Sequence, residues 1–175
     1  MKREYLGDSY DAVKRLWCDL LAEWVPLYAE PRFIPNEIRR EFTAFTRIPI
    51  LGAHRPAAYS LLNDPDTGIR LPDRSNQSEG FTHISLATIR GQVLESDVRC
   101  VITFDQSHHR EKDFNAGEQR LAKRDWLKRN DVYSFYYVSH APFLFAFANT
   151  GHMDTVRAIL HKAGVPVGRI EADSL

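Results

Sequence analysis

The sequence predicts an α/β fold, with one domain built on a mostly parallel sheet of about five strands and helices on both faces. Strand-like apolar runs alternate with amphipathic helical stretches along the chain, as in sheets whose parallel strands are joined by helices. Residues 98–104 are continuously apolar and β-rich, which is typical of a central strand buried on both faces. Two acidic turns, at residues 7–14 and 63–68, each follow a strand-like run and precede a helical one.

In the first half of the chain, periodicity and capping residues define two helices. Apolar residues recur at helical spacing over residues 13–24. Ser9 is the expected N-cap of this helix, and Asp11 lies in the first turn, where a negative charge suits the helix dipole. Asn36 is the expected cap of a second helix that ends before Pro49. Strands are expected at residues 4–6, 25–28 and 57–62.

The second half continues the alternation. Thr82 is the expected cap of a helix that runs to Val93, and a basic helix is expected at residues 117–129. Gly164 ends the last helix, in the position that favours glycine. Strands are expected at residues 98–104, 133–138 and 167–170, the last of them at an edge of the sheet.

An aromatic cluster follows the strand expected at residues 133–138. Phe143, Phe145 and Phe147 occupy alternate positions, so they line one face of a strand. The cluster is expected in the core or at a subunit contact, which leaves a homodimer open. Pro142 lacks the amide hydrogen that a sheet ladder needs, and it confines this segment to an edge or a bulge.

Composition bounds the class of protein. The chain has 175 residues, of which 43% are hydrophobic and 26% charged, which is typical of one globular domain. A formal net charge of zero argues against a global nucleic-acid footprint, although a local basic stripe is compatible with it. We recognise no signal peptide and no apolar run of membrane-spanning length, so we expect a cytoplasmic protein without a membrane partner. Cys18 and Cys100 are expected as buried, reduced thiols.

Acidic residues are expected to gather where the strands end. Because the carboxyl ends of parallel strands share one edge of a sheet, Asp8, Asp64 and Asp105 should lie on the same edge. Convergent carboxylates bind Mg²⁺ or Mn²⁺, or act as general acid and base, and Asp66 would add a fourth metal ligand. The same edge is expected to hold Asp11, Lys14, Gln106, Ser107, Ser139 and His140.

The acidic turns also have a purely structural interpretation. An aspartate at a helix start is a good cap, and Asp-Pro-Asp-Thr-Gly is favourable turn chemistry in which Gly68 supplies a positive φ. The adjacent His108 and His109 point opposite ways in an extended chain, which favours a solvated loop over a metal site. His140 is either a site residue or a histidine that is hydrogen-bonded at the edge of the core.

Four basic residues share one face of the expected helix at residues 117–129. They are suited to following the phosphate backbone of a nucleic acid, and a charged solvent-exposed face is the alternative. These residues are Arg120, Lys123, Arg124 and Lys128.

Several catalytic signatures are absent from the sequence. There is no phosphate-binding loop, no Gly-x-Gly-x-x-Gly, no Cys-x-x-Cys, no His-Glu-x-x-His and no Gly-x-Ser-x-Gly. These absences weaken ATPase, dehydrogenase, structural zinc and serine-hydrolase interpretations.

Residues 5–14 resemble the opening of a group of uncharacterised bacterial proteins. Their hallmark is an aromatic residue, then Gly-Asp-x-x-Asp-x-x-Lys leading into a Leu-rich helix. The same group has a strand that ends in Asp-Pro-Asp-Asn-Gly, and residues 64–68 match this motif with one change, at Thr67. The resemblance implies no assigned activity.

The chain is also remotely similar to Rossmann-like adenine-N6 methyltransferases that act on ribosomal RNA. Asp8, Asp11 and Lys14 match a segment that helps to bind S-adenosylmethionine, and residues 64–65 match part of the strand-end motif that carries the target amine. This similarity implies a three-layer Rossmann-like domain. Two features depart from it: residues 28–32 contain no glycine, and Asp66-Thr67 replaces a proline and an aromatic residue.

A weaker similarity connects the chain with small nucleases of the PIN and NYN type. These place an aspartate after the first strand and an Asp-x-Ser/Asp motif after a later one. Asp8 and residues 105–107 match this arrangement.

Three functions are consistent with these patterns. The first is a metal-assisted phosphodiester hydrolase acting on nucleic acid, with Mg²⁺ or Mn²⁺ held by the four acidic residues and with His140 or Lys14 assisting proton transfer or charge stabilisation. The second is a methyltransferase-like protein, active or degenerate, that binds S-adenosylmethionine or a nucleotide, with Asp11 and Ser107 as candidate cofactor ligands. The third is a non-catalytic interaction module in which the acidic turns only shape loops.

Overall fold

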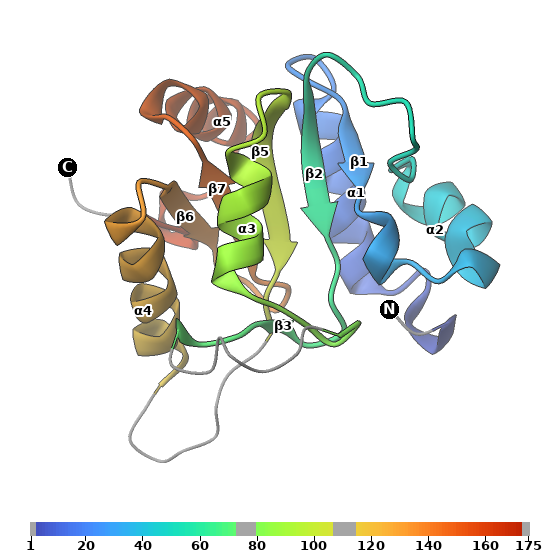
Figure 1. Ribbon diagram of the computed structural model, residues 1–175, viewed down its shortest axis with the longest axis horizontal. Helices are drawn as coiled ribbons and strands as arrows, with labels where there is room; N and C mark the ends of the chain where they lie inside the picture. Colours follow the sequence, from blue (N-terminus) through green and yellow to red (C-terminus); the bar gives the residue numbers. More distant parts are fainter. Residues whose placement is uncertain (1–2, 73–79, 107–114, 173–175) are drawn as a thin grey trace.

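The main feature of the fold is a six-stranded sheet, seen in the computed structural model, which describes residues 3–72, 80–106 and 115–172 (Figure 1). Its strands, in spatial order, are β1 (Leu27–Ala29), β2 (Tyr59–Asn63), β5 (Val98–Phe104), β7 (Phe143–Phe147), β6 (Tyr133–Tyr137) and β8 (Ile170–Glu171). A separate two-stranded sheet joins β3 (Gly68–Ile69) to β4 (His83–Ile84).

The strand directions confirm a mostly parallel α/β sheet. β1, β2 and β5 pair in parallel, and β6 runs the same way because both β5 and β6 are antiparallel to β7. β8 pairs antiparallel with β6 at the edge, close to the expected position of the last strand. The sheet has six strands rather than about five. Residues 143–147 join the sheet as an interior strand, in a hairpin with residues 133–137.

The aromatic segment is an interior strand, so the prediction that Pro142 confines it to an edge was wrong. β7 lies between β5 and β6, and all of its residues are buried. Pro142 precedes the strand and removes no amide from its ladder. Its carbonyl instead accepts a hydrogen bond from the Asp105 amide at 3.0 Å. The phenylalanines therefore belong to the core.

Helices pack in two groups along the sheet (Figure 1). α3 packs against β5 and β7, and its neighbour α4 packs against β6. α1 and α5 contact each other, and α5 also packs against β7. α2 packs beside α1. The bounds are α1 (Ser9–Leu21), α2 (Arg39–Thr46), α3 (Leu86–Val93), α4 (Ala116–Arg129) and α5 (Thr150–Lys162).

The helix starts differ from prediction by one to three residues. Asp8, not Ser9, caps α1, because its Oδ1 accepts from the amides of Tyr10 and Asp11. Ser85, not Thr82, caps α3, since residues 83–84 pair as β4. After Asn36, a 3₁₀ turn (Asn36–Ile38) leads into α2.

The first acidic turn does not follow a strand, contrary to prediction. The segment Arg3–Tyr5 is a 3₁₀ turn. Gly7 then adopts φ of 77°, a left-handed conformation that suits glycine, and the chain enters α1. The first turn therefore reaches the sheet edge through α1 and not through a strand.

The core gathers aromatic side chains from the helices and the sheet. Trp17 of α1 is fully buried and meets Tyr137, Phe143 and Phe145 edge-on, with ring centroids 4.8–5.9 Å apart. Aromatic pairs prefer such edge-to-face geometry. Cys100 is buried as predicted, and Cys18 is half-buried with a free thiol.

The carboxyl ends of β2 and β5 meet at one edge, beside β3 (Figure 1). In an open α/β sheet, this edge is where ligands usually bind. Among the described residues, no helix combines the length and the apolar character that crossing a membrane requires.

Candidate ligand site at the carboxyl end of the sheet

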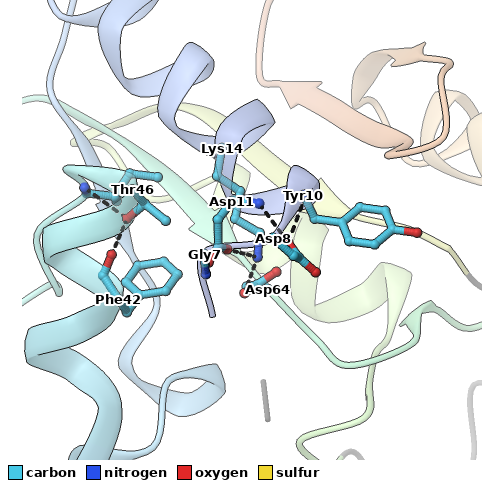
Figure 2. Close-up of polar contacts among 9 residues, drawn as sticks. Gly7, Asp8, Tyr10, Asp11, Lys14, Phe42, Thr46 and Asp64 are labelled. Carbon is cyan, nitrogen blue, oxygen red and sulfur yellow. Dashed lines mark hydrogen bonds and ion pairs between the residues drawn. The ribbon is translucent and has the colours of Figure 1, made fainter. Parts of the chain in front are cut away.

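Lys14 joins the two acidic turns. Its Nζ lies 3.0 Å from Asp11 Oδ1 and 2.8 Å from Asp64 Oδ2, and all three side chains are buried (Figure 2). Asp11 and Lys14 are one helical turn apart on α1, so both face the end of β2, where Asp64 follows the strand. Figure 2 shows the lysine reaching toward both carboxylates. Because Asp11 and Lys14 are one helical turn apart, the Asp-x-x-Lys motif contacts the second motif through Lys14 and Asp64.

The charges of this buried cluster do not balance. Burial raises the pKa of Asp64 above its ordinary value, and the neighbouring Lys14 ammonium only partly opposes this effect. For Lys14, burial lowers the pKa, but the charges and hydrogen bonds of Asp64 and Asp11 outweigh burial, so its pKa is raised. The raised pKa of Lys14 reflects its two carboxylate partners, whereas the raised pKa of Asp64 reflects mainly its burial.

Backbone geometry fixes the first turn. The Gly7 amide donates to Asp11 Oδ2 at 2.7 Å, and Asp8 Oδ1 accepts from the amides of Tyr10 and Asp11 at 2.8 and 3.1 Å. Asp11 therefore uses one oxygen for Gly7 and the other for Lys14. Asp8 Oδ2 has no hydrogen-bond partner among the described residues.

The second turn is fixed by a close approach of Gly68 to Asp105. Gly68 has φ of 135°, and a Cβ at this position would lie 2.4 Å from Asp105 Oδ1 and 2.8 Å from Asp105 Cα. The following amide, that of Ile69, donates to the same Oδ1 at 2.9 Å. Only glycine lets the two backbones come this close, which explains the final residue of the Asp-Pro-Asp-Thr-Gly motif.

Asp105 belongs to a second buried polar cluster. Its Oδ2 accepts from Lys123 Nζ at 2.7 Å and from the Tyr136 hydroxyl at 2.6 Å. Burial raises the pKa of Tyr136 well above its ordinary value, and the negative charge of Asp105 adds to this shift. Asp105 is thus held by groups from β3, α4 and β6, and it ties these elements to the end of β5.

An acidic, aromatic pocket of about 260 Å³ opens beside the Lys14 cluster. Its carboxylates come from Asp8, Asp64 and Asp66, and Lys14 is the one cation among the described residues that line it. The remaining lining residues are Tyr5, Tyr10, Pro65, Phe104 and Gln106. The Tyr10 and Phe104 rings meet edge-on, with centroids 5.5 Å apart. We call this cavity the acidic pocket.

A second pocket of about 200 Å³ lies next to the acidic pocket. It is lined by Asp105, Gln106, Ala116, Arg120, Ser139, His140 and Pro142. Gln106 lines both cavities, and its Nε2 donates to the Tyr10 hydroxyl at 2.7 Å. The Tyr10 ring also lies 5.6 Å from the His140 ring. We call this cavity the arginine pocket.

The four predicted metal ligands do not form one site. Asp8, Asp64 and Asp66 line the acidic pocket, whereas Asp105 lines the arginine pocket. Across the described ranges, no group of three or more His, Cys, Asp or Glu side chains is placed to hold a metal ion. The reason is that lysines already occupy the centres of both clusters: Lys14 lies between Asp11 and Asp64, and Lys123 meets Asp105. A single Mg²⁺ or Mn²⁺ held by all four carboxylates does not fit this arrangement, because Asp105 lines a different pocket from the other three.

The basic residues of α4 do not form one exposed face, which corrects the prediction of a phosphate-binding stripe. Lys123 and Arg124 are buried, and Lys123 is paired with Asp105. Arg120 is half-buried and pairs with Glu171 of β8. Lys128 alone of the four is exposed. Arg120 and Lys123 are turned toward the sheet, where Glu171 and Asp105 compensate their charges.

Of the remaining predicted residues, some line the arginine pocket and the others lie outside the residues that the structure describes. His140 is exposed and Ser139 half-buried, and both line the arginine pocket. Ser139 Oγ is used locally, in hydrogen bonds with the Ala141 carbonyl and amide. Ser107, His108 and His109 lie outside the described residues.

Sequence reasoning missed two aromatic walls of the acidic pocket, Tyr10 and Phe104. The signal for Phe104 was present, because successive strand residues point to opposite faces. Phe104 accordingly faces the acidic pocket, while Asp105 faces the arginine pocket. Nothing local identifies Tyr10, whose role depends on where α1 docks.

Comparisons with protein families, with curated protein sequences and with solved structures find no match for this chain. Its function must therefore be argued from the chemistry of the two pockets.

Proposed function

We propose that the acidic pocket binds a nucleobase that carries an exocyclic amine, within a nucleotide-binding, methyltransferase-like protein. The observation that carries this proposal is the combination of aromatic walls with carboxylate and amide oxygens in one small cavity. At about 260 Å³, the cavity is slightly smaller than the usual range for drug-sized ligands, which suits a single ring system.

The polar groups of the pocket favour a hydrogen-bond donor over an anion. Lys14 is already paired with Asp11 and Asp64, so it is not free to bind an anion, and Asp8 Oδ2 has no hydrogen-bond partner among the described residues. Carboxylates accept hydrogen bonds, and an exocyclic amine supplies two donors. Phe104 and Tyr10 offer ring surface for stacking, as in sites that accept unstacked bases.

S-adenosylmethionine in its usual binding mode is not supported by the residues after β1. Glu30 caps a 3₁₀ turn (Pro31–Arg32–Phe33) by accepting from the Arg32 amide, and this segment has no glycine to let a ligand approach the backbone. The proposal therefore concerns the base and involves no methyl-transfer step. We also propose that the helices cover both faces of the sheet in a three-layer, Rossmann-like arrangement.

Calorimetric titration with nucleosides tests the proposal. Adenosine and cytidine, which carry an amine, should bind at least about tenfold more tightly than uridine, because unpaired carboxylates reject a carbonyl. Equal affinity for uridine, or no binding of any nucleoside, would contradict it.

Two Asp8 variants separate charge from folding in the same assay. Asp8→Asn keeps a good helix cap but removes a carboxylate, whereas Asp8→Ala removes both. We expect both variants to lose nucleoside affinity and only Asp8→Ala to lose about 1 kcal/mol of stability. Retained affinity in Asp8→Asn would exclude this carboxylate as an acceptor.

Metal-assisted hydrolysis of a phosphodiester in nucleic acid is the second candidate, because three carboxylates line one pocket. Mn²⁺-dependent cleavage of DNA or RNA, lost on addition of EDTA, would support it. An absence of cleavage together with an absence of nucleoside binding would leave the interaction module as the remaining function.

A further inference from the structure

The arginine pocket differs in charge from the acidic pocket beside it. Asp105 is the one carboxylate among the described residues that line it, and it already accepts from three donors. Glu171, the partner of Arg120, accepts two bonds from that arginine at 2.8 Å. The charged donor left to a ligand is therefore the Arg120 guanidinium. Anionic ligands are the natural complement of such a surface.

Arg120 has donors to spare. Its bonds to Glu171 use Nε and Nη2, so Nη1 makes no hydrogen bond among the described residues. A guanidinium carries five N–H donors in a fixed plane. Glu171 and the Tyr136 ring, whose centroid lies 6.0 Å from the guanidinium carbon, hold this plane in place. A pre-positioned guanidinium is the preferred protein group for phosphate.

The two pockets share one lining residue, Gln106. Its partner Tyr10 lies between Phe104 and His140. His140 is exposed, and its imidazole adds ring nitrogens to the lining of the arginine pocket. A ligand with two linked groups can therefore occupy both cavities on either side of Gln106.

We propose that the arginine pocket is the phosphate subsite of the same ligand, so that the protein binds a nucleotide with its base in the acidic pocket and its phosphate on Arg120 and His140. This inference rests on the proposed function. The opposite character of the two pockets orients the ligand, because the carboxylates repel the phosphate and Arg120 attracts it. The phosphate belongs either to a free nucleotide or to a nucleic-acid strand, which present the same group.

The test compares adenosine, AMP and a short single-stranded oligo(dA) by calorimetry. AMP should bind at least about tenfold more tightly than adenosine, the effect of one charge-assisted hydrogen bond. If the oligonucleotide binds still more tightly than AMP and in an Arg120-dependent way, the phosphate is that of a strand. If AMP is preferred, the ligand is a free nucleotide.

A double variant assigns the effect to Arg120. Arg120→Gln with Glu171→Gln removes both charges of the pair and leaves neither unpaired in the half-buried site. The affinity ratio of AMP to adenosine should fall to about one in this variant. Arg129→Gln, an exposed change on the same helix, should keep the ratio, and melting curves confirm that each variant folds.

The outcomes separate this inference from the proposed function. Equal binding of adenosine and AMP by the wild type overturns the phosphate subsite and leaves the base pocket intact. A preference for AMP that survives in the double variant also overturns it, because the phosphate then lies elsewhere. No binding of any nucleoside or nucleotide overturns both.

Discussion

Lys14 is the residue that connects the two acidic turns, and it does so from a fully buried position. One ammonium between two carboxylates leaves the cluster with an excess negative charge. Loss of the lysine should therefore destabilise the folded protein more than loss of either aspartate alone. This asymmetry follows from the cost of an uncompensated buried charge.

Replacement of Lys14 by methionine should lower the free energy of unfolding by about 3–5 kcal/mol, because it leaves two buried carboxylates without a counter-charge. Urea denaturation at pH 7 measures the loss. Asp64→Asn is the matched control and should cost much less, since Asp11 still pairs with Lys14 and burial already disfavours the Asp64 charge. Equal losses of unfolding free energy in the two variants would show that the charge imbalance does not determine the stability of this cluster.

Gly68 offers a second test at the residue scale. Gly68→Ala should destabilise the protein by about 3 kcal/mol, because a Cβ would meet Asp105 in a backbone conformation that side chains rarely adopt. The control is Gly52→Ala, where a Cβ would meet nothing within 4 Å. Chemical denaturation of both variants provides the comparison, and a mild effect at Gly68 would mean that β3 and Asp105 can move apart.

At the scale of elements, capping residues and local propensities determine where the helices form, whereas the partner strands determine where each strand lies in the sheet. The periodicity of residues 13–24 and the apolar run 98–104 were sufficient to predict α1 and β5. The strand expected before Gly7 and the edge position expected for β7 were wrong, because a short apolar run has no local signal for its partners. β7 pairs with both β5 and β6, which makes it an interior strand whatever precedes it.

Within a helix, substitution of Gly91 should change the stability in the opposite direction to substitution of Gly68. It lies exposed within α3, where a Cβ would meet nothing within 4 Å. Gly91→Ala should therefore stabilise the protein by about 0.5–1 kcal/mol, through the backbone entropy of the unfolded chain. An increased urea midpoint with an unchanged slope would agree with this, while a decrease would indicate a tight contact of α3 at that position.

At the scale of the whole molecule, three buried groups respond to alkali in the same direction. Burial raises the pKa of Cys100 and, together with Asp105, that of Tyr136. The two aspartates raise the pKa of Lys14 against the effect of burial. The folded chain thus keeps protons that the unfolded chain releases, so the free energy of unfolding should fall as pH rises above about 9 for the thiol and about 10 for the other two groups.

Denaturation curves between pH 7 and pH 11 check this dependence. Tyr136→Phe removes one of the titrating groups, and its stability should decline less steeply above about pH 10 than that of the wild type. A stability that stays constant over this range would mean that these groups have ordinary pKa values in the folded protein.

By itself, the sequence determined the α/β class, most helices, the central strand and the edge of the sheet where acidic residues gather. These depend on periodicity, caps and turn chemistry, which act over a few residues. Only the tertiary structure decided what the acids do. Contacts across the fold, from Lys14 to Asp64 and from Lys123 to Asp105, turned four expected metal ligands into two lysine-centred clusters and divided the edge into two pockets. Charge pairing depends on distance in space, and the spacing of residues along a chain does not specify that distance.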